Sequence, residues 1–368
     1  MAEYSPMMQH YLATKAEYKD CILFYRLGDF YEMFFDDALV VSKELELTLT
    51  GKDCGQEERA PMCGVPFHAA ETYINRLVSN GHKVAICEQM EDPKQAKGIV
   101  KREVIKVVTP GTNLNSQALD ETKNNYLMSI VYLGDVLGVA IADYSTGDGF
   151  VTEIETGAEL IDEINKFVPS EIILNEYFAM SGIDLTFISE KLSISVSTLE
   201  NWYFDDDSCK AKLKEHFHVN MLDGLGIKDY PVGIDAAGAL LIYLTQTQKS
   251  DMSHITSIVP YTTGKYMLID SSSRRNLELV ETMREKQKRG TLLWVLDKTK
   301  TAMGARLLRN YIEQPLIHKN EILRRQDAVE ELNMNYISRE EICEYLNPVY
   351  DLERLIGRIS YKTANPRD

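Results

Sequence analysis

Residues 24–34 read Phe24-Tyr25-Arg26-Leu27-Gly28-Asp29-Phe30-Tyr31-Glu32-Met33-Phe34, and they indicate how the N-terminal part of the chain is built. The run that leads into this stretch, from Cys21 to Tyr25, is apolar and predicts a buried strand. Phe30 and Glu32 stand two positions apart just beyond that strand, and Gly28 precedes them. This spacing can present a flat apolar wedge beside a hydrogen-bonding carboxylate. Apolar wedges unstack base steps from the minor groove of DNA, where a carboxylate is useful only if it meets a base edge.

Helix and strand patterns alternate around this stretch and predict a small mixed α/β domain. Helices are expected to start at Ser5-Pro6, to carry Phe34, Ala38, Val41 and Leu45 on one face, and to cover residues 72–80 before Gly81. Strands are expected at residues 47–50, 83–87 and 104–108, with a polar loop up to residue 59. The composition of Thr109-Pro110-Gly111-Thr112-Asn113 predicts a linker to the next domain.

The middle of the chain predicts a second α/β domain. Three runs of apolar or alternating residues, separated by short turns, predict an antiparallel meander with strands at 126–131, 136–142 and 149–154. A helix near 159–167, a strand at 171–174 and a helix at 236–248 are expected to follow. The acidic run Asp205-Asp206-Asp207 is expected in a solvated loop, because the spacing, glycine and glutamate of a calcium-binding EF-hand are missing.

The last third of the chain has a helical pattern. Apolar residues recur at intervals of three and four between Leu292 and Tyr311, and Gln314-Pro315 ends that run. Further helices are expected at about 319–333 and 338–359. The predicted fold class is therefore multidomain α/β plus α, with domains at 1–112, 113–260 and 261–368.

The net charge of −16 is distributed unevenly. Residues 116–260 carry 8 basic and 23 acidic side chains, a net charge of −15, whereas residues 1–115 carry −4 and residues 261–368 carry +3. An acidic middle domain is not expected to lie along a phosphate backbone, and its field suits a protein partner or simply a solubilising surface. Phosphate binding by the rest of the chain is expected to be weak and sensitive to salt.

Composition also excludes several classes of protein. No stretch approaches the roughly 20 apolar residues of a membrane span, and charged residues interrupt any signal-peptide pattern at the N-terminus. The six cysteines contain no CxxC pair, which favours reduced thiols over disulfides or a zinc site.

Several motifs occur in a specific order along the chain. After Gly28-Asp29-Phe30-Tyr31-Glu32 come Pro61-Met62-Cys63-Gly64-Val65-Pro66-Phe67-His68, Val84-Ala85-Ile86-Cys87-Glu88-Gln89 and Val107-Val108-Thr109-Pro110-Gly111-Thr112. Ser273-Arg274-Arg275-Asn276-Leu277-Glu278-Leu279, Met303-Gly304-Ala305-Arg306-Leu307-Leu308-Arg309 and Ala364-Asn365-Pro366-Arg367-Asp368 follow. The ordered set closely resembles the MutS family of DNA mismatch repair proteins over essentially the whole chain. The resemblance implies a mismatch-recognition domain, a ribonuclease-H-like connector and the start of a helical core or lever domain.

The resemblance also implies roles for individual residues. Phe30 would stack on the mispaired base from the minor groove, and Glu32 would hydrogen-bond to that base. A mispair unstacks at less cost than a Watson–Crick pair, so a wedge can find it without reading sequence. On pattern alone, Phe30 would be expected in a core.

Five further residues are weaker candidates for DNA contacts, namely Leu27, Lys52, Phe67, His68 and Lys106. The two lysines stand where the family usually places residues that contact the DNA backbone. Solvated surface lysines and a structural turn at residues 65–68 are the alternative interpretations. His68 has no patterned nucleophile or acid around it, which argues against a catalytic base.

Cofactors are not expected in this chain. No GxxxxGK[ST] phosphate-binding motif occurs in it, and the resemblance implies that ATP and Mg²⁺ bind only in an ATPase domain beyond residue 368. We therefore expect the N-terminal part of a longer protein, with no catalytic or metal-binding residue of its own. The implied partners are mismatched duplex DNA, a MutL-type protein at the connector, and a second copy in the full-length homodimer. The implied location is the bacterial cytoplasm, at the nucleoid and not at a membrane.

Two other functions remain open at this point. A metal-dependent nuclease could use Asp143 and Asp148 in a ribonuclease-H-like fold, although no convincing third carboxylate is found. A MutS-like paralogue could bind branched DNA without mismatch specificity. Such paralogues commonly lack the Phe30–Glu32 pair, so its presence counts against that interpretation.

Overall fold

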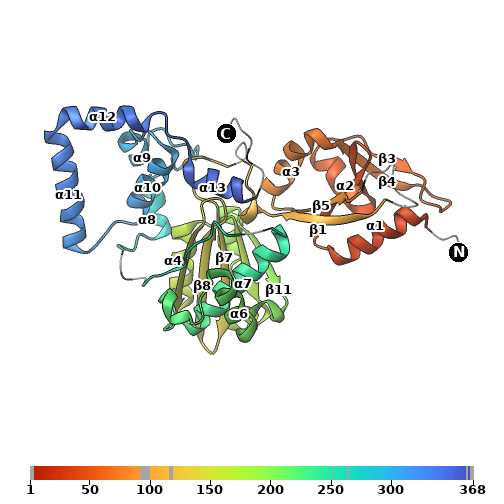
Figure 1. Ribbon diagram of the computed structural model, residues 1–368, viewed down its shortest axis with the longest axis horizontal. Helices are drawn as coiled ribbons and strands as arrows, with labels where there is room; N and C mark the ends of the chain where they lie inside the picture. Colours follow the sequence, from red (N-terminus) through yellow and green to blue (C-terminus); the bar gives the residue numbers. More distant parts are fainter. Residues whose placement is uncertain are drawn as a thin grey trace. The chain divides into compact units, whose positions relative to one another are not determined.

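The computed structural model describes residues 4–91, 100–115, 119–250, 252–262, 264, 266–361 and 364. It divides into two compact units, Met1–Ala118 with Leu244–Ser250, and Leu119–Tyr243 with Asp251–Asp368. The described strands form two six-stranded mixed sheets, one in each unit, and a helical region follows the second sheet (Figure 1). The predicted fold class, α/β domains followed by helices, is confirmed.

The sheet of the first unit has the strand order β3-β4-β2-β1-β5-β6. Its strands are β1 (Cys21–Leu27), β2 (Phe30–Phe34), β3 (Thr50–Lys52), β4 (Ala60–Pro66), β5 (Lys83–Gln89) and β6 (Arg102–Val108). β1 runs parallel to β5, and the remaining neighbours pair antiparallel. The apolar run that predicted a buried strand is thus a central strand.

Helices cover both faces of this sheet. Helix α1 (Pro6–Glu17) lies on one face, and α2 (Phe35–Glu44) and α3 (Ala70–Ser79) lie on the other (Figure 1). Alternate residues of each strand therefore enter two different cores: Phe24, Tyr31 and Met33 pack with α2 and α3, whereas Leu23, Tyr25 and Phe34 pack with α1. The carboxylate of Asp37 accepts hydrogen bonds from Lys15 Nζ at 2.8 Å and from the Leu23 amide at 3.0 Å.

Several details of the first unit differ from the sequence expectations. Strands β2 and β4 were not expected, and the strand predicted at 47–50 is β3, which starts three residues later and ends two residues later. The predicted linker at 109–113 contains a 3₁₀ turn, Pro110–Thr112, in which Gly111 and Thr112 are buried. The Thr109 and Thr112 hydroxyls lie 2.8 Å apart and satisfy each other. Small polar residues therefore formed a packed cap here and not an exposed linker.

A distant part of the sequence completes the first unit. Residues 244–250 end helix α7 (Pro231–Gln248) and belong to this unit. Gln248 Nε2 donates to the Val107 carbonyl at 2.9 Å, and Lys249 Nζ donates to the Val104 carbonyl at 2.8 Å. Lys249 Nζ also donates to the Tyr18 hydroxyl at 2.8 Å. The outer strand β6 is thus held by side chains that lie far away in the sequence.

The sheet of the second unit has the order β11-β10-β7-β8-β9-β12. Its strands are β7 (Tyr126–Leu133), β8 (Val136–Asp143), β9 (Asp148–Ile154), β10 (Glu171–Asn175), β11 (Ser195–Leu199) and β12 (Val259–Pro260). β7, β8 and β9 form the antiparallel meander that the sequence predicted. β10 pairs parallel with both β7 and β11.

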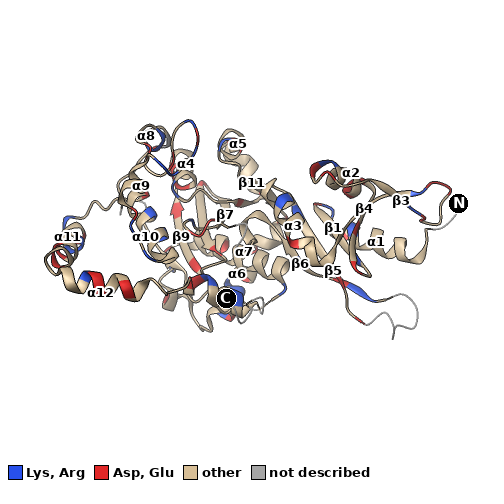
Figure 2. Ribbon diagram, turned by 90° about the horizontal axis from the view of Figure 1, so that it is seen from above, with Lys and Arg blue, Asp and Glu red and all other residues tan. Residues whose placement is uncertain are grey.

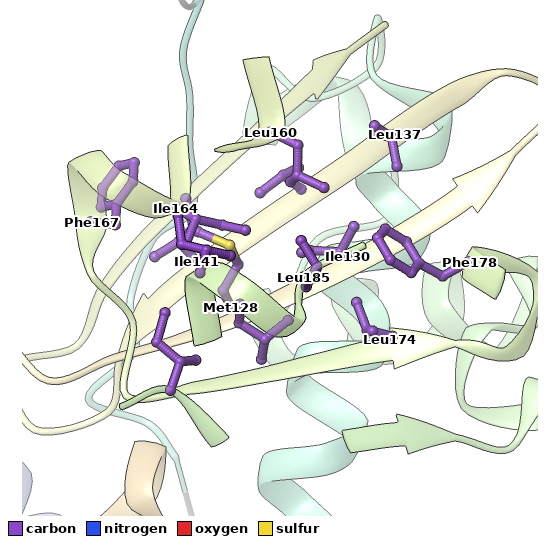
Figure 3. Close-up of a cluster of buried hydrophobic side chains, with 14 of the residues drawn as sticks. Met128, Ile130, Leu137, Ile141, Leu160, Ile164, Phe167, Leu174, Phe178 and Leu185 are labelled. Atoms are coloured by element: carbon purple, nitrogen blue, oxygen red, sulfur yellow. The ribbon is translucent and has the colours of Figure 1, made fainter. Parts of the chain in front are cut away.

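The core of the second unit lies on one face of this sheet. Side chains from β7, β8, β10 and α4 (Gly157–Phe167) point toward one another in Figure 3, among them Met128, Ile141 and Ile164. Helix α7 packs on the opposite face, where a Cβ atom on Gly138 would lie 2.1 Å from the Val232 carbonyl oxygen. A bulkier residue than glycine at position 138 would therefore push α7 off the sheet.

The acidic run at 205–207 is a correction to the sequence prediction. It does not lie in a solvated loop: Asp205 caps helix α6 (Asp206–Phe217), and its side chain accepts from the Ser208 amide at 3.0 Å. Acidic residues at a helix N-terminus stabilise it through the cap and the helix dipole. Asp235 of α7 is buried near this cap, and burial together with Asp206 raises the pKa of Asp235 to about 7.

The helical region contains α8 (Ser271–Asn276), α9 (Leu292–Leu296), α10 (Ala302–Glu313), α11 (Lys319–Met334), α12 (Tyr336–Leu346) and α13 (Leu352–Ser360). The helix predicted at 338–359 is interrupted at Asn347-Pro348, because Pro348 has no amide hydrogen to donate and its ring crowds the preceding helical turn. Helices α11 and α12 bury none of their residues. Of the motif at 364–368, residues 365–368 lie outside the described residues.

Two arginines join α10 and α13 to the backbone at residues 120–121. Arg306 binds Asp351 through Nη1 at 2.6 Å and donates to the Glu121 carbonyl at 3.0 Å. Arg354 Nη1 donates to the Asp120 carbonyl at 3.1 Å. Backbone carbonyls that no strand uses are thus satisfied by buried guanidinium groups.

Candidate nucleic-acid interface

The candidate site lies at the hairpin that joins β1 to β2. Leu27 pairs with Phe30 across a two-residue turn formed by Gly28 and Asp29. Gly28 has φ +59°, and a positive φ at the first central position suits the tight turns that connect twisted strands. The turn places Phe30 at the very start of β2, beside Pro66 of β4.

Phe30 is exposed and not part of a core. Its exposed fraction is 46%, whereas Phe24 and Phe34 of the same stretch are 0% and 1% exposed. Phe30 lies between these two buried residues in the sequence, and its own ring is exposed at the start of β2. Most phenylalanine side chains are buried, so the exposed ring of Phe30 is unusual and is accessible to a ligand.

Glu32 lies on the same face of the sheet as Phe30, because residues two apart in a strand share a face. Its Oε2 accepts a hydrogen bond from Lys52 Nζ at 2.5 Å. The two side chains are 16% and 32% exposed, respectively. The pair connects β2 to β3, two strands away in the sheet. Structure thus joins two of the sequence candidates that lie 20 residues apart.

Leu27 and Phe67 flank the wedge. Leu27 is half-buried against the core that contains α1. Phe67 is 45% exposed and begins the 3₁₀ turn Phe67–Ala69, and its amide donates to the Asp29 carbonyl at 2.9 Å. His68 is exposed, and its ring meets that of Phe67 edge-on at 6.0 Å. Leu27, Phe67 and His68 therefore lie near the hairpin turn. Leu27 ends β1, whereas Phe67 and His68 follow the end of β4.

Lys106 does not join this group. It pairs with Ile86 in the sheet, and Ile86 packs with the core of α2 and α3. Cross-strand partners share a face, so Lys106 faces away from Phe30 and Glu32. Burial lowers the pKa of Lys106, and Glu71 of α3 acts in the opposite direction.

The sequence did not single out a second group of residues at the hairpin. The Arg26 guanidinium lies 3.8 Å from the centroid of the Phe67 ring and 3.3 Å from Glu88. The Tyr31 hydroxyl donates to the same Glu88 carboxylate, and burial raises the pKa of Tyr31. The signal in the sequence was the charged Arg26 that follows the buried run of β1.

Arg102 extends this polar group. It is 7% exposed, and its Nε donates to the Arg26 carbonyl at 2.8 Å. Figure 2 shows both blue and red segments on the strands of the first unit, so its charges are mixed and not uniformly basic. The site therefore offers apolar surface and paired charges more than a phosphate-binding surface.

The residues of the nuclease alternative are arranged differently. The Asp143 side chain is buried and accepts hydrogen bonds from Asn124 Nδ2, the Asn125 amide, and the amide and hydroxyl of Ser145, at 2.6 to 3.0 Å. Within the described part of the chain, no three His, Cys, Asp or Glu residues are grouped as metal ligands. The lone pairs of Asp143 are already used by the fold, which argues against a metal-ligand role.

The thiols give no sign of reactivity. All six cysteines are free, and five of them are buried. Burial raises the pKa of Cys63 to about 11 and that of Cys87 to about 12. Neutral buried thiols act as small apolar side chains.

No helix within the described residues is long and apolar enough to cross a membrane.

Three family models match the chain in succession. MutS domain I matches residues 5–117, MutS domain II matches residues 125–256 and MutS domain III matches residues 272–368. Together these matches span most of the chain. The candidate hairpin falls within the first of them.

Curated relatives agree with these matches. The DNA mismatch repair protein MutS of Lachnoclostridium phytofermentans is 66% identical over 368 residues, which is 100% of this chain and 40% of the relative. The proteins of the same name from Ruminiclostridium cellulolyticum and Acetivibrio thermocellus are 55% and 52% identical, and each alignment covers 100% of this chain and 42% of the relative. The chain thus spans about two fifths of the length of these relatives.

Proposed function

The chain belongs to the MutS family of DNA mismatch repair proteins, and from that membership we propose that its first domain recognises mispaired bases in duplex DNA. The observation that carries this proposal is the exposed Phe30, which shares one face of a tight hairpin with the carboxylate of Glu32. Phe30 would enter a base step from the minor groove, and Glu32 would accept a hydrogen bond from the displaced base.

The energetics favour discrimination by deformation. Unstacking a base step costs a few kcal/mol, and the cost is smallest where pairing is already weak. An aromatic ring that stacks on a base returns about 1–3 kcal/mol. The balance is therefore favourable at a mispair and unfavourable at a Watson–Crick pair. Phe30 needs no base-edge contacts for this selection, and Glu32 would refine it.

The fold supports Phe30 in this role. Phe24 and Phe34 are buried on opposite sides of the sheet, so the hairpin that carries Phe30 is held from both faces. A rigid support means that little conformational entropy is lost when the ring enters the DNA. Phe67, His68 and Leu27 would contact the sugar edges beside the wedge, and Lys106 remains a predicted contact of the DNA backbone.

The remaining partners are proposed from the family. The acidic connector, residues 113–260, would present a surface to a MutL-type protein, and the helical region would couple mismatch binding to an ATPase domain that uses ATP and Mg²⁺. The full-length protein would act as a homodimer at the nucleoid. In that assembly this chain would supply recognition and not catalysis.

The proposal is tested by fluorescence anisotropy with a G·T-mismatched duplex and its matched control. The full-length protein that carries this chain is compared with its Phe30→Ala variant. We expect the wild type to prefer the mismatch, and the variant to lose the preference while it keeps weak, salt-sensitive duplex binding. Phe187→Ala is the matched control, because it removes an exposed phenylalanine ring from the second unit.

Two results would contradict the proposal. If Phe30→Ala retained the preference, the wedge would be assigned to the wrong residue. If the wild type bound both duplexes equally, mismatch recognition itself would be wrong, and branched DNA would be the next ligand to test.

A further inference from the structure

The ion pair between Lys52 and Glu32 gives Lys52 a partner within the protein. Lys52 lies on β3 opposite Ala60, and its side chain extends along the sheet toward β2. Its Nζ lies 5.7 Å from the centroid of the buried Phe34 ring and donates to Glu32 Oε2. The Lys52 ammonium group therefore contacts both an aromatic ring and a carboxylate.

The backbone leaves space for this arrangement at Gly64. Gly64 is the cross-strand partner of Glu32 on β4, and a Cβ atom built on it would lie 3.5 Å from Glu32 Cγ and 3.3 Å from the Tyr31 carbonyl oxygen. A larger residue at position 64 would press on the Glu32 side chain. The absence of a side chain there lets Glu32 lie along the sheet toward Lys52.

The pair solves an electrostatic problem of the proposed function. An isolated carboxylate near the minor groove is repelled by the phosphates on both strands. A lysine ammonium in contact with it cancels the net charge of the pair. Lys52 occupies Oε2 alone, and Oε1 accepts no hydrogen bond from the described residues. One carboxylate oxygen is therefore held in place while the other is available to a base.

We infer that Lys52 is a positioning residue that acts through Glu32 and not a residue that contacts a DNA phosphate. This inference rests on the proposed function, because it assigns how Glu32 is held for the mispaired base. Lys52 neutralises the Glu32 carboxylate and holds it through Oε2, which leaves Oε1 for the base. The consequence is that Lys52 affects the preference for a mispair and not the general affinity for duplex DNA.

Two roles for Lys52 predict different binding data. A phosphate contact contributes equally to matched and mismatched duplexes, so its loss lowers both affinities by one factor and reduces the salt slope by about one charge. A positioning lysine contributes only where Glu32 meets a base. Its loss then lowers the ratio of the two affinities.

The experiment measures both affinities in the full-length protein at several salt concentrations, with G·T and matched duplexes as probes. The variants are Lys52→Gln, Lys52→Arg, Glu32→Gln and the double variant Lys52→Gln/Glu32→Gln. Lys43→Gln is the matched control, because Lys43 is an exposed lysine of α2 in the same unit. Thermal unfolding of each variant verifies that the fold is retained.

We expect Lys52→Gln to lower the mismatch-to-match ratio by about threefold, the size typical of a half-exposed ion pair. Lys52→Arg should restore the ratio, and Lys52→Gln should add no further loss in the Glu32→Gln background. Lys43→Gln should leave the ratio unchanged. The rescue and the lack of additivity distinguish positioning through Glu32 from a general effect on the fold.

The inference is overturned if Lys52→Gln weakens both duplexes by the same factor and lowers the salt slope, because Lys52 would then contact a phosphate. It is also overturned if the losses from Lys52→Gln and Glu32→Gln are additive. Both results leave the proposed function intact, since the wild type would still prefer the mismatch. A wild type without any preference would instead remove the proposed function and this inference together.

Discussion

The β1–β2 hairpin and the β8–β9 hairpin both carry carboxylates near strand ends, and the fold uses them in opposite ways. Glu32 is half-buried, has one lysine partner and keeps one oxygen unused among the described residues. Asp143 is buried and its two oxygens accept hydrogen bonds from Asn124, Asn125 and Ser145. A carboxylate can serve a ligand only where the fold has left it access and a free lone pair. The comparison favours the first hairpin as the site and the second as structure.

The strongest way to break this comparison is Asp143→Ala. Removal of Asp143 leaves two buried amides and a buried hydroxyl without their acceptor, so we expect a loss of about 3–5 kcal/mol in the free energy of unfolding. Urea unfolding monitored by tryptophan fluorescence measures it. Asp148→Ala is the control, because Asp148 is the exposed cross-strand partner of Asp143 and should cost less than about 1 kcal/mol. Equal losses for the two variants would show that Asp143 is not held as described.

A second carboxylate of the second unit sharpens the contrast, because it is buried without a full set of hydrogen-bond partners. Oδ1 of Asp235 has no hydrogen-bond partner among the described residues, and burial raises its pKa from 3.8 to about 7. The folded state therefore holds a proton that the unfolded state releases, so stability from this group is present at low pH and is lost as the pH rises from about 4 to about 7.

Asp235→Asn should accordingly stabilise the chain at pH 8 by about 2 kcal/mol, after allowance for partial solvent screening, and should have little effect at pH 4. Thermal unfolding of wild type and variant across this range measures the difference. Asp207→Asn is the control, because Asp207 is an exposed aspartate in the first turn of α6. A stability difference that does not change between pH 4 and pH 8 would contradict the assigned pKa.

At the first hairpin, the free energy of the contact between Arg26 and Phe67 can be measured directly. Arg26 lies over the Phe67 ring at 3.8 Å, and a cation–π contact at a partly exposed site contributes about 1 kcal/mol. A double-mutant cycle with Arg26→Leu and Phe67→Leu should give a coupling of that size in the free energy of unfolding. A coupling near zero would mean that Phe67 is not held by Arg26 in solution.

Lys106→Ala should have the smallest effect. If Lys106 contacts a phosphate, the variant binds matched and mismatched duplexes equally less well, with a salt slope smaller by about one charge. Anisotropy titrations at several salt concentrations measure that slope. An unchanged slope would assign Lys106 to the packing between β6 and α3. Glu71 of α3 is the charged group that raises the pKa of Lys106 there.

The sequence predicted the regular elements better than the strands that build the hairpin site. The meander of β7, β8 and β9 was predicted because its strands are apolar or alternating runs and its turns are short. β4 was not predicted, because Pro61, Gly64 and Pro66 are residues that usually interrupt strands. Its sheet partners β2 and β3 determine its conformation, and such pairing is not encoded locally.

The site could be predicted only in part for the same reason. The exposure of Phe30 is the opposite of what composition indicates, because most phenylalanines are buried, and the family resemblance alone singled it out. The contact between Lys52 and Glu32 depends on how β3, β4 and β2 pair, and the stacking of Arg26 on Phe67 depends on the end of β4. The cap at Asp205 was missed because an acidic run looks the same in a loop and at a helix start.

The hydrogen bonds of Gln248 and Lys249 to β6 have a consequence for the order of events during synthesis. The first unit needs residues 244–250, which leave the ribosome long after residue 118. At bacterial translation speeds of about 5–20 residues per second, this delay is roughly 7 to 26 s. During that interval the outer strand β6 has unsatisfied carbonyls at Val104 and Val107, and nascent chains would be most exposed to proteases and to chaperones at this edge. The first unit therefore becomes complete only after residues 119–243 have been made.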